Sequence, residues 1–313
     1  MIDSEQLCEE FIELNKDELG KKHTNYNNQI LYNNIYAIVG FVFIGVIIVL
    51  LIMRIMNVPL IIILGALGSF MIFKSINSNV NSLMNQKRYE EEYVSKISTF
   101  IINKYFDDSE CYDGIAFNSK SKYDDANYDE DADKILDLRH LSIKYKDYKI
   151  NVMNIIAARQ DIIDIDEETD KVQTSVDLVF EGLFIEFKLK KKTGARIGLT
   201  DPLGKHKMNN CDELLEMDYS QFEKEFDVYT NNKQKAMEIL TVDVLVKLEE
   251  IHRNSKTGFD ILIDDDTVYI RIPYSKKMFE MGYDLVNKDA VERDNEIIYL
   301  LKEIVEALTV NDI

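Results

Sequence analysis

Two uncharged apolar stretches decide the architecture of this chain: IYAIVGFVFIGVIIVLLIM at residues 35–53 and PLIIILGALGSFMIF at residues 59–73. A helix needs about 20 apolar residues to cross the hydrocarbon core of a bilayer. The first stretch supplies 19 residues, which make a helix about 28 Å long. The second reaches a similar length if it continues to residue 76 and the Lys74 ammonium extends to the headgroups. The sequence therefore predicts a transmembrane helical hairpin over residues 35–76.

Two alternatives to this hairpin are a cleaved signal peptide and a buried hairpin of a soluble protein. A signal peptide begins with a short basic segment and has a shorter apolar core, whereas residues 1–34 are polar and partly acidic. A core helix has a polar face, and residues 35–53 have none. Both observations favour retained membrane helices.

Small residues in the second apolar stretch favour close helix packing. Gly65 and Ser69 form a small-xxx-small pair, and Gly68 adds to the same face. Such pairs let helix backbones approach closely in a membrane. We expect this face to pack inside the hairpin or between protomers.

Positively charged residues beside the apolar stretches indicate the orientation. The loop between the stretches carries Arg54 alone, and the outer flanks carry more charges: Lys21, Lys22, Lys74, Lys87 and Arg88. Short loops rich in Lys and Arg stay on the cytoplasmic side. We therefore expect a multi-pass protein with both termini in the cytoplasm.

The remaining sequence divides around the hairpin. Residues 1–34 form a cytoplasmic segment with an amphipathic helix, and residues 77–106 continue the helical pattern as a stalk. Residues 107–313 mix strand and helix patterns without strict alternation. This mixture predicts an α+β domain with a mainly antiparallel sheet and flanking helices.

Apolar periodicity places the elements of that domain. Alternation over residues 176–180 changes parity before residues 183–189, and we expect a β-bulge at Gly182. Two paired patterns around Asp264-Asp265-Asp266 predict a β-hairpin whose turn holds these aspartates. Helical patterns occur at three places: residues 233–240, residues 242–251 and a C-terminal helix through Leu308.

The charge distribution limits the class of partner. The net charge is −19, which argues against nucleic acid, because binding there depends on Lys and Arg contacts to phosphates. One basic cluster interrupts the acidic sequence: Lys188, Lys190, Lys191, Lys192 and Arg196. It could contact anionic lipid headgroups, but we favour a solvated turn that balances the acidic domain.

An acidic segment at residues 124–133 resembles the start of a calcium loop. Asp125, Asn127 and Asp129 match the alternation of an EF-hand, but Glu130 replaces its glycine and Leu136 replaces its bidentate glutamate. A solvated acidic loop is therefore the favoured interpretation, and a cation site is the alternative.

The sequence provides no candidate catalytic, cofactor-binding or metal-ligating residue, and no cofactor is expected. The four histidines (His23, His140, His206 and His252) are scattered, and no P-loop, GxGxxG or GxSxG motif occurs. Three cysteines, Cys8, Cys111 and Cys211, show no disulfide or metal spacing. A non-enzymatic role is favoured.

Several short motifs resemble those of the bacterial two-transmembrane domain-of-unknown-function family 3137. They are Phe180-Glu181-Gly182-Leu183-Phe184, Phe226-Asp227-Val228-Tyr229, Ala236 with Ile239-Leu240-Thr241, Ile272-Pro273 and Met278-Phe279-Glu280. The likeness extends from about residue 5 to 308 and departs at a longer acidic insert around residues 159–174. It implies the bacterial cytoplasmic membrane and supplies no catalytic residues. Members are often encoded beside LemA-like membrane proteins, which hints at a partner of that kind.

These observations favour a membrane-anchored cytoplasmic interaction or scaffold module that contacts the bilayer and a protein partner. The alternatives are a membrane-tethered, hydrolase-like enzyme and a sensor of a ligand or cation. A concave pocket with converging titratable groups would indicate an enzyme. An exposed apolar patch would indicate a scaffold.

Overall fold

The computed structural model describes residues 1–53, 58–112, 118–128, 132–166, 171–202, 208–211, 213–282 and 285–310; within these, side chains 78–83, 111–112, 161–166 and 171–174 are not described. The chain divides into two compact units. Unit 1 comprises Met1–Leu7, Ser95–Glu280 and Lys288–Ile313, and unit 2 comprises Cys8–Val94 and Met281–Asn287. The domain boundaries expected from the sequence stay a prediction.

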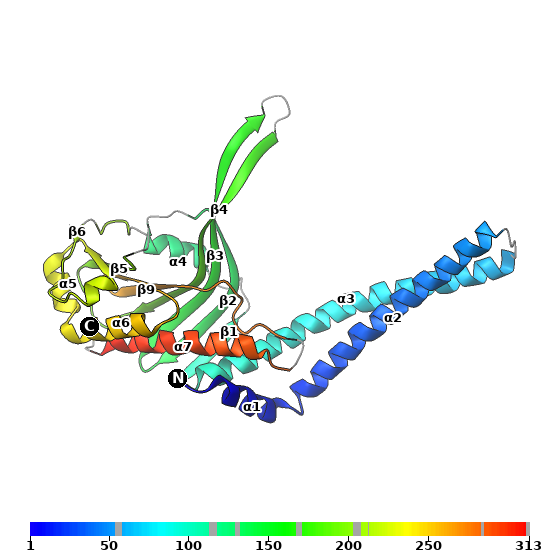
Figure 1. The fold of residues 1–313 in the computed structure, drawn as a ribbon, viewed down its shortest axis with the longest axis horizontal. Helices are drawn as coiled ribbons and strands as arrows, with labels where there is room; N and C mark the ends of the chain where they lie inside the picture. Colours follow the sequence, from blue (N-terminus) through cyan, green and yellow to red (C-terminus); the bar gives the residue numbers. More distant parts are fainter. Residues whose placement is uncertain are drawn as a thin grey trace. The chain divides into compact units, whose positions relative to one another are not determined.

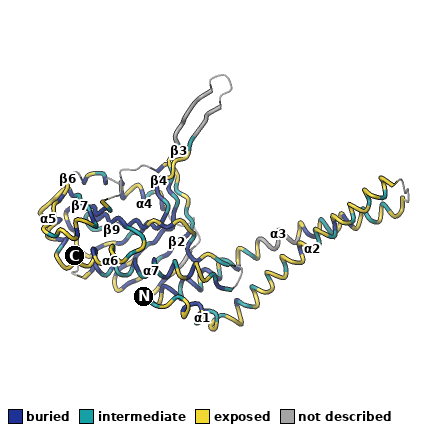
Figure 2. Tube along the Cα trace, viewed as in Figure 1, coloured by how far each residue is buried: buried dark blue, intermediate teal, exposed yellow. Residues whose placement is uncertain are grey.

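Unit 2 is built from long helices. α1 (Ser4–Asn15) crosses the boundary from unit 1, α2 spans Leu19–Ile52, and α3 (Val58–Ile102) continues into unit 1. α2 and the first part of α3, Val58–Asn77, are long and apolar enough to cross a membrane, and only 6% and 11% of their most apolar windows are buried. Figure 2 shows this exposure along both helices. The exposed apolar surface argues against the buried-hairpin alternative and is consistent with membrane association.

α2 and α3 approach each other closely at two glycines. A Cβ on Gly40 would lie 2.6 Å from Ile72 Cγ1, and one on Gly68 would lie 3.3 Å from the Gly40 carbonyl oxygen. A Cβ on Gly65 would meet only Ile47 at 3.8 Å, an ordinary contact, and Ser69 is exposed. Of the expected small-residue face, Gly68 makes the close contact inside the hairpin, with Gly40, and Gly65 and Ser69 do not.

Unit 1 contains a nine-stranded sheet in which every recorded strand pair is antiparallel (Figure 1). The order is β1-β2-β3-β4-β9-β8-β5-β7-β6. The strands are β1 Asp108–Tyr112, β2 Lys134–Tyr145, β3 Tyr148–Asp166, β4 Lys171–Lys188, β5 Arg196–Thr200, β6 Glu213–Leu214, β7 Asp227–Thr230, β8 Asp260–Asp264 and β9 Thr267–Pro273. The helices are α4 Ser119–Ala126, the 3-10 helix η1 Phe222–Lys224, α5 Lys233–Ile239, α6 Val242–Asn254 and α7 Lys288–Thr309. The predicted α+β class with an antiparallel sheet is confirmed.

Helices cover both faces of this sheet. Tyr123 of α4 belongs to a buried cluster with Met153 and Phe184 of the sheet. The next residue along β3, Asn154, points to the opposite face and accepts a hydrogen bond from the Met278 backbone at 3.1 Å. α7 lies on that second face, where Tyr145 donates a hydrogen bond to Glu306 at 2.6 Å.

The expected bulge occurs at Val179 instead of Gly182. Ala157 pairs with Phe180 and Ala158 pairs with Leu178, which leaves Val179 as the extra residue. Gly182 has another role, because a Cβ there would overlap the carbonyl oxygen of Ile272 on the neighbouring strand β9. Its glycine therefore permits close strand pairing, and the parity change of the sequence marks a bulge three residues earlier.

The chain before β2 contains two elements that the sequence did not indicate, β1 and α4, and α4 overlaps the acidic segment at residues 124–133. Asp124 and Asp125 lie in the last turn of α4, and Asn127 ends this helix in the left-handed conformation with φ 49°. Asp124 and Asp125 are therefore helical, which corrects the acidic-loop interpretation for these two residues. Residues 129–131 of the segment lie outside the described residues.

Candidate functional site

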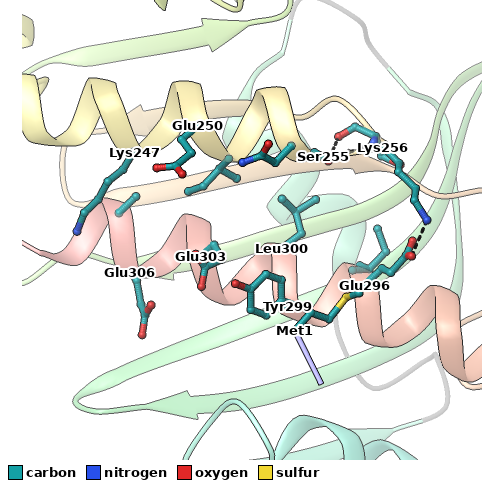
Figure 3. Close-up of a pocket in the computed structure, with 15 residues that line it drawn as sticks. Met1, Lys247, Glu250, Ser255, Lys256, Glu296, Tyr299, Leu300, Glu303 and Glu306 are labelled. Atoms are coloured by element: carbon teal, nitrogen blue, oxygen red, sulfur yellow. Dashed lines mark hydrogen bonds and ion pairs between the residues drawn. The ribbon is translucent and has the colours of Figure 1, made fainter. Parts of the chain in front are cut away.

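A groove of about 510 Å³ lies between α6 and α7 in unit 1 (Figure 3). Each helix buries one apolar face, with Leu245 and Leu248 on α6 and Leu301 and Ile304 on α7. This amphipathic spacing leaves charged residues of both helices at the outer surface. The volume falls in the range of about 300–1,000 Å³ that is usual for small-molecule sites.

The lining of the groove combines apolar and charged side chains. Its apolar part consists of Met1, Ile251, Ile297, Tyr299, Leu300 and Ala307. Its charged part consists of Lys247 and Glu250 on α6, Lys256 just after α6, and Glu296, Glu303 and Glu306 on α7. This lining suits a ligand that has both an apolar and a charged portion.

Several of these charges already have partners. Lys256 Nζ lies 2.6 Å from Glu296 Oε1, and Glu306 accepts from Tyr145 at 2.6 Å and from Lys302 at 3.0 Å. Although burial opposes its ionisation, these two hydrogen bonds hold the pKa of Glu306 below its ordinary value. Lys247 and Glu250 are exposed and form no ion pair within the described part of the chain. They are the charges of the groove that remain available.

His252 forms a second cluster, which the sequence did not reveal. Its Nδ1 lies 2.8 Å from Glu225 Oε2, and its Nε2 lies 4.0 Å from Asp201 Oδ2. The ring packs against Phe226 and Phe259 with centroid distances of 4.6 and 5.4 Å. These partners come from separate parts of the chain, so spacing could not have found them. Because Nε2 is buried, we interpret the cluster as a structural contact that holds α6 against the segment after η1.

The other histidines do not join this cluster. His140 on β2 is buried, and burial, followed by the charges of Lys122 and Lys149, lowers its pKa to about 4. His23 lies on α2, and His206 lies outside the described residues. Within the described ranges no three His, Cys, Asp or Glu side chains are placed to hold a metal ion. The expectation of no catalytic or metal site stays a prediction.

The basic cluster at residues 188–196 is largely held by aspartates. Lys190 lies 3.1 Å from Asp147, Lys192 lies 2.8 Å from Asp265, and the buried Arg196 pairs with Asp264. Asp264 is the last residue of β8, and Asp265 lies in the β8–β9 turn that the sequence predicted. These pairs support the interpretation of the cluster as a turn that balances acidic charge.

The Met278-Phe279-Glu280 motif is fixed by a buried carboxyl group. Asp294 of α7 accepts hydrogen bonds from the Tyr274 hydroxyl and from the Phe279 backbone, the latter at 2.6 Å. Phe279 has φ 53°, which is unusual for a bulky residue. Complete burial raises the pKa of Asp294 to about 7, although both hydrogen bonds and two arginines oppose the shift. The motif therefore has a structural role.

An apolar face is exposed where β3 and β4 leave the sheet. β2 pairs with β3 only as far as Ala158, and β9 pairs with β4 only from Gly182, so residues 159–166 and 171–178 pair with each other as an arm. Leu136, Val176 and Leu178 are 59%, 67% and 62% exposed. The strand register puts these three side chains on one face. We call them the arm face.

Comparison with known proteins gives a family and no activity. No curated protein matches the chain. Among solved structures, the crystal structure of the mycobacterial trehalose monomycolate transport factor A, TtfA, is similar at 12% identity with a TM-score of 0.27, over 51% of this chain and 75% of that chain. The model of the family "Protein of unknown function (DUF3137)" matches residues 178–310, from the end of β4 to the end of α7. Residues 178–310 of this chain therefore belong to the DUF3137 family.

Proposed function

We propose that this chain is a membrane-anchored interaction module. α2 and the first part of α3 hold it in the bacterial cytoplasmic membrane with both termini in the cytoplasm. Unit 1 then presents a docking surface to a protein partner, and a LemA-like membrane protein is the first partner to test. The arm face carries this proposal, because exposed apolar side chains grouped on one side of a projecting hairpin are typical of a protein contact.

A photo-crosslinking amino acid at position 176 tests the proposal in native membranes. Val176 lies on the arm face, whereas the next residue, Asp177, points to the other side of β4 and lies 3.7 Å from Arg159. We expect a discrete cross-linked product from position 176 and none from position 177. Leu178→Lys should abolish that product. Equal products from both positions would show that the arm face is not a docking surface.

Engineered cysteines test the topology. The native Cys8 and Cys211 are buried, so they are poor reporters for a thiol reagent. Lys16 and Lys191 are exposed, and Lys16→Cys and Lys191→Cys should resist a membrane-impermeant maleimide in intact cells and react after lysis. Asn57→Cys, between the two apolar stretches, should react in intact cells. The reverse pattern would overturn the orientation.

Ligand sensing is the second candidate function, and the α6–α7 groove favours it. The groove has the volume of a small-molecule site and an apolar lining with charged residues. A sensor predicts saturable binding of a defined compound to unit 1. A membrane-tethered enzyme predicts in addition a group that acts on that compound.

A further inference from the structure

From the α6–α7 groove we infer a binding site for a small zwitterion with an apolar side chain, of the apolar amino-acid class. The inference rests on the second candidate function, ligand sensing at this groove, and is independent of the proposed docking at the arm face. The inference rests on three features of the groove: two available opposite charges, the apolar floor beside them, and the volume.

The first feature is a pair of opposite charges one helical turn apart. Lys247 and Glu250 occupy positions i and i+3 of α6 and both line the groove. Side chains at this spacing are neighbours on a helix surface. In the described part of the chain they nevertheless form no ion pair with each other or with another residue. A ligand with an anionic group and an ammonium group could pair with both.

A matched pair on α5 shows that charges at this spacing can form an ion pair. Lys235 and Glu238 have the same i, i+3 spacing, and their atoms Nζ and Oε2 lie 2.6 Å apart. The side-chain hydrogen bond from Lys235 lowers the pKa of Glu238. The sequence spacing alone therefore allows an ion pair. On α6 the two charged groups line the groove without meeting.

The second feature is the floor beside these charges. Figure 3 shows Glu303 of α7 across from Glu250, with Tyr299 and Leu300 farther along the same helix toward the Lys256–Glu296 pair. Glu303 adds a second carboxylate on the side where a ligand ammonium would lie. The Lys256–Glu296 pair stands at the far end from Lys247. The groove thus offers a cationic end, an anionic middle and an apolar floor.

These features select the class of ligand. A simple anion would be attracted to Lys247 and repelled by Glu250 and Glu303, and a simple amine would meet the opposite conflict. A zwitterion satisfies both charges, and its apolar side chain covers the floor formed by Ile297 and Leu300. The volume of about 510 Å³ accommodates such a molecule.

Three leucine-like probes test the inference with the full chain in phosphatidylcholine nanodiscs. Leucine carries both charges, leucinamide lacks the carboxylate, and 4-methylpentanoate lacks the ammonium. Ligand-observed NMR titrations should give leucine the highest affinity. Each missing charge should weaken binding about tenfold or more, because a charge-assisted hydrogen bond is lost.

Two substitutions identify which residue reads which charge. In Lys247→Gln the affinity for leucine should fall to that for leucinamide, while leucinamide itself binds unchanged. In Glu250→Gln it should fall to that for 4-methylpentanoate. Both positions are exposed, so neither change should disturb folding. Lys235→Gln and Glu238→Gln on α5 repeat the two charge changes outside the groove and should have no effect.

The outcome that overturns the inference is equally definite. The absence of leucine binding at about 10 mM, a concentration about ten times a Kd of 1 mM, would exclude the site. An affinity for leucine that is unchanged in both α6 variants, or that is reduced equally in the α5 controls, would show that the binding is non-specific. Neither result would affect the cross-linking test of the arm face.

Discussion

The helix pair α2–α3 and the helix pair α6–α7 distribute their apolar residues in opposite ways. In α2 and α3 the apolar side chains face outward, and Phe41 and Ile48 are 67% and 52% exposed. The contact between those helices uses Gly40 and Gly68. In α6 and α7 the apolar side chains face the fold, and Leu301 is fully buried.

This difference is consistent with lipid around the first helix pair and water around the second. Water favours burial of apolar side chains, whereas lipid removes that driving force and leaves packing of small residues to hold helices together. The same residue types therefore have different roles in the two pairs. A charged residue should therefore impair folding when it replaces an apolar residue of α7, and membrane insertion when it replaces one of α2.

The largest expected effect comes from a charge in the α7 core. Leu301→Asp places an unpaired carboxylate where the native side chain has no exposure, and should destabilise unit 1 by about 4 kcal/mol or more. Thermal unfolding followed by circular dichroism measures this loss. Leu301→Met, which keeps the volume, should cost less than about 1.5 kcal/mol. Similar melting of both variants would show that this part of α7 is not a core.

A charge in α2 should leave unit 1 folded and act on membrane insertion. Ile48→Lys lies within the uncharged stretch and should cost about 2.5–3.5 kcal/mol of insertion free energy. Fractionation should move protein from the membrane to the soluble or degraded pool, and Ile48→Leu should not. A stable membrane fraction for Ile48→Lys would contradict a lipid-facing position.

Asp294 should make the stability of unit 1 depend on pH. Because its folded pKa of about 7 exceeds the ordinary value of 3.8, its contribution to stability is complete below pH 3.8 and is lost as pH rises through 7. Relative to Asp294→Asn, the free energy of unfolding should fall by about 2 kcal/mol between pH 5.5 and 8. Denaturant titrations at several pH values measure this difference. Other titrating groups such as His140 are present in both proteins, so their contributions cancel. A constant difference would contradict the raised pKa.

The smallest effect concerns the glycines of the α2–α3 pair. Gly40→Ala adds a methyl group that would lie 2.6 Å from Ile72 Cγ1, and should destabilise the pair by about 1–2 kcal/mol. Hydrogen exchange of α2 in nanodiscs should accelerate accordingly. Gly65→Ala, with its nearest neighbour at 3.8 Å, should exchange like the native chain. The opposite order would restore Gly65–Ser69 as the packing face.

Strong periodicity explains which elements the sequence could predict. The C-terminal helix and the β8–β9 hairpin have regular apolar patterns, and the structure contains both as α7 and as the pair around Asp264. By contrast, α4 is hydrophilic and buries only Ser119, Tyr123 and Ala126. Its one local signal is Asn118, whose side chain caps the helix by accepting from the Ser121 backbone. β1 is a five-residue edge strand without apolar alternation.

The candidate sites could not be predicted because their residues meet only in the folded chain. Lys247 and Glu250 are ordinary charges of an amphipathic helix until α7 supplies Leu300 and Glu303. His252 meets Glu225 and Asp201 from two other segments. The bulge at Val179 puts Val176 and Leu178 on the arm face, and the apolar alternation of the sequence predicted this bulge at Gly182 instead.

A hydrogen-bonded cluster of Ile2, Tyr105 and Asn295 in unit 1 has a consequence for synthesis on the ribosome. The Tyr105 hydroxyl accepts from the Ile2 backbone at 2.9 Å and donates to Asn295 at 2.8 Å, while the Asn295 amide donates to the Ile2 carbonyl at 2.9 Å. Asn295 is made long after both apolar helices have emerged. The backbone of Ile2 therefore gains its Asn295 partner only after the first part of α7 has been synthesised, so this part of unit 1 forms late.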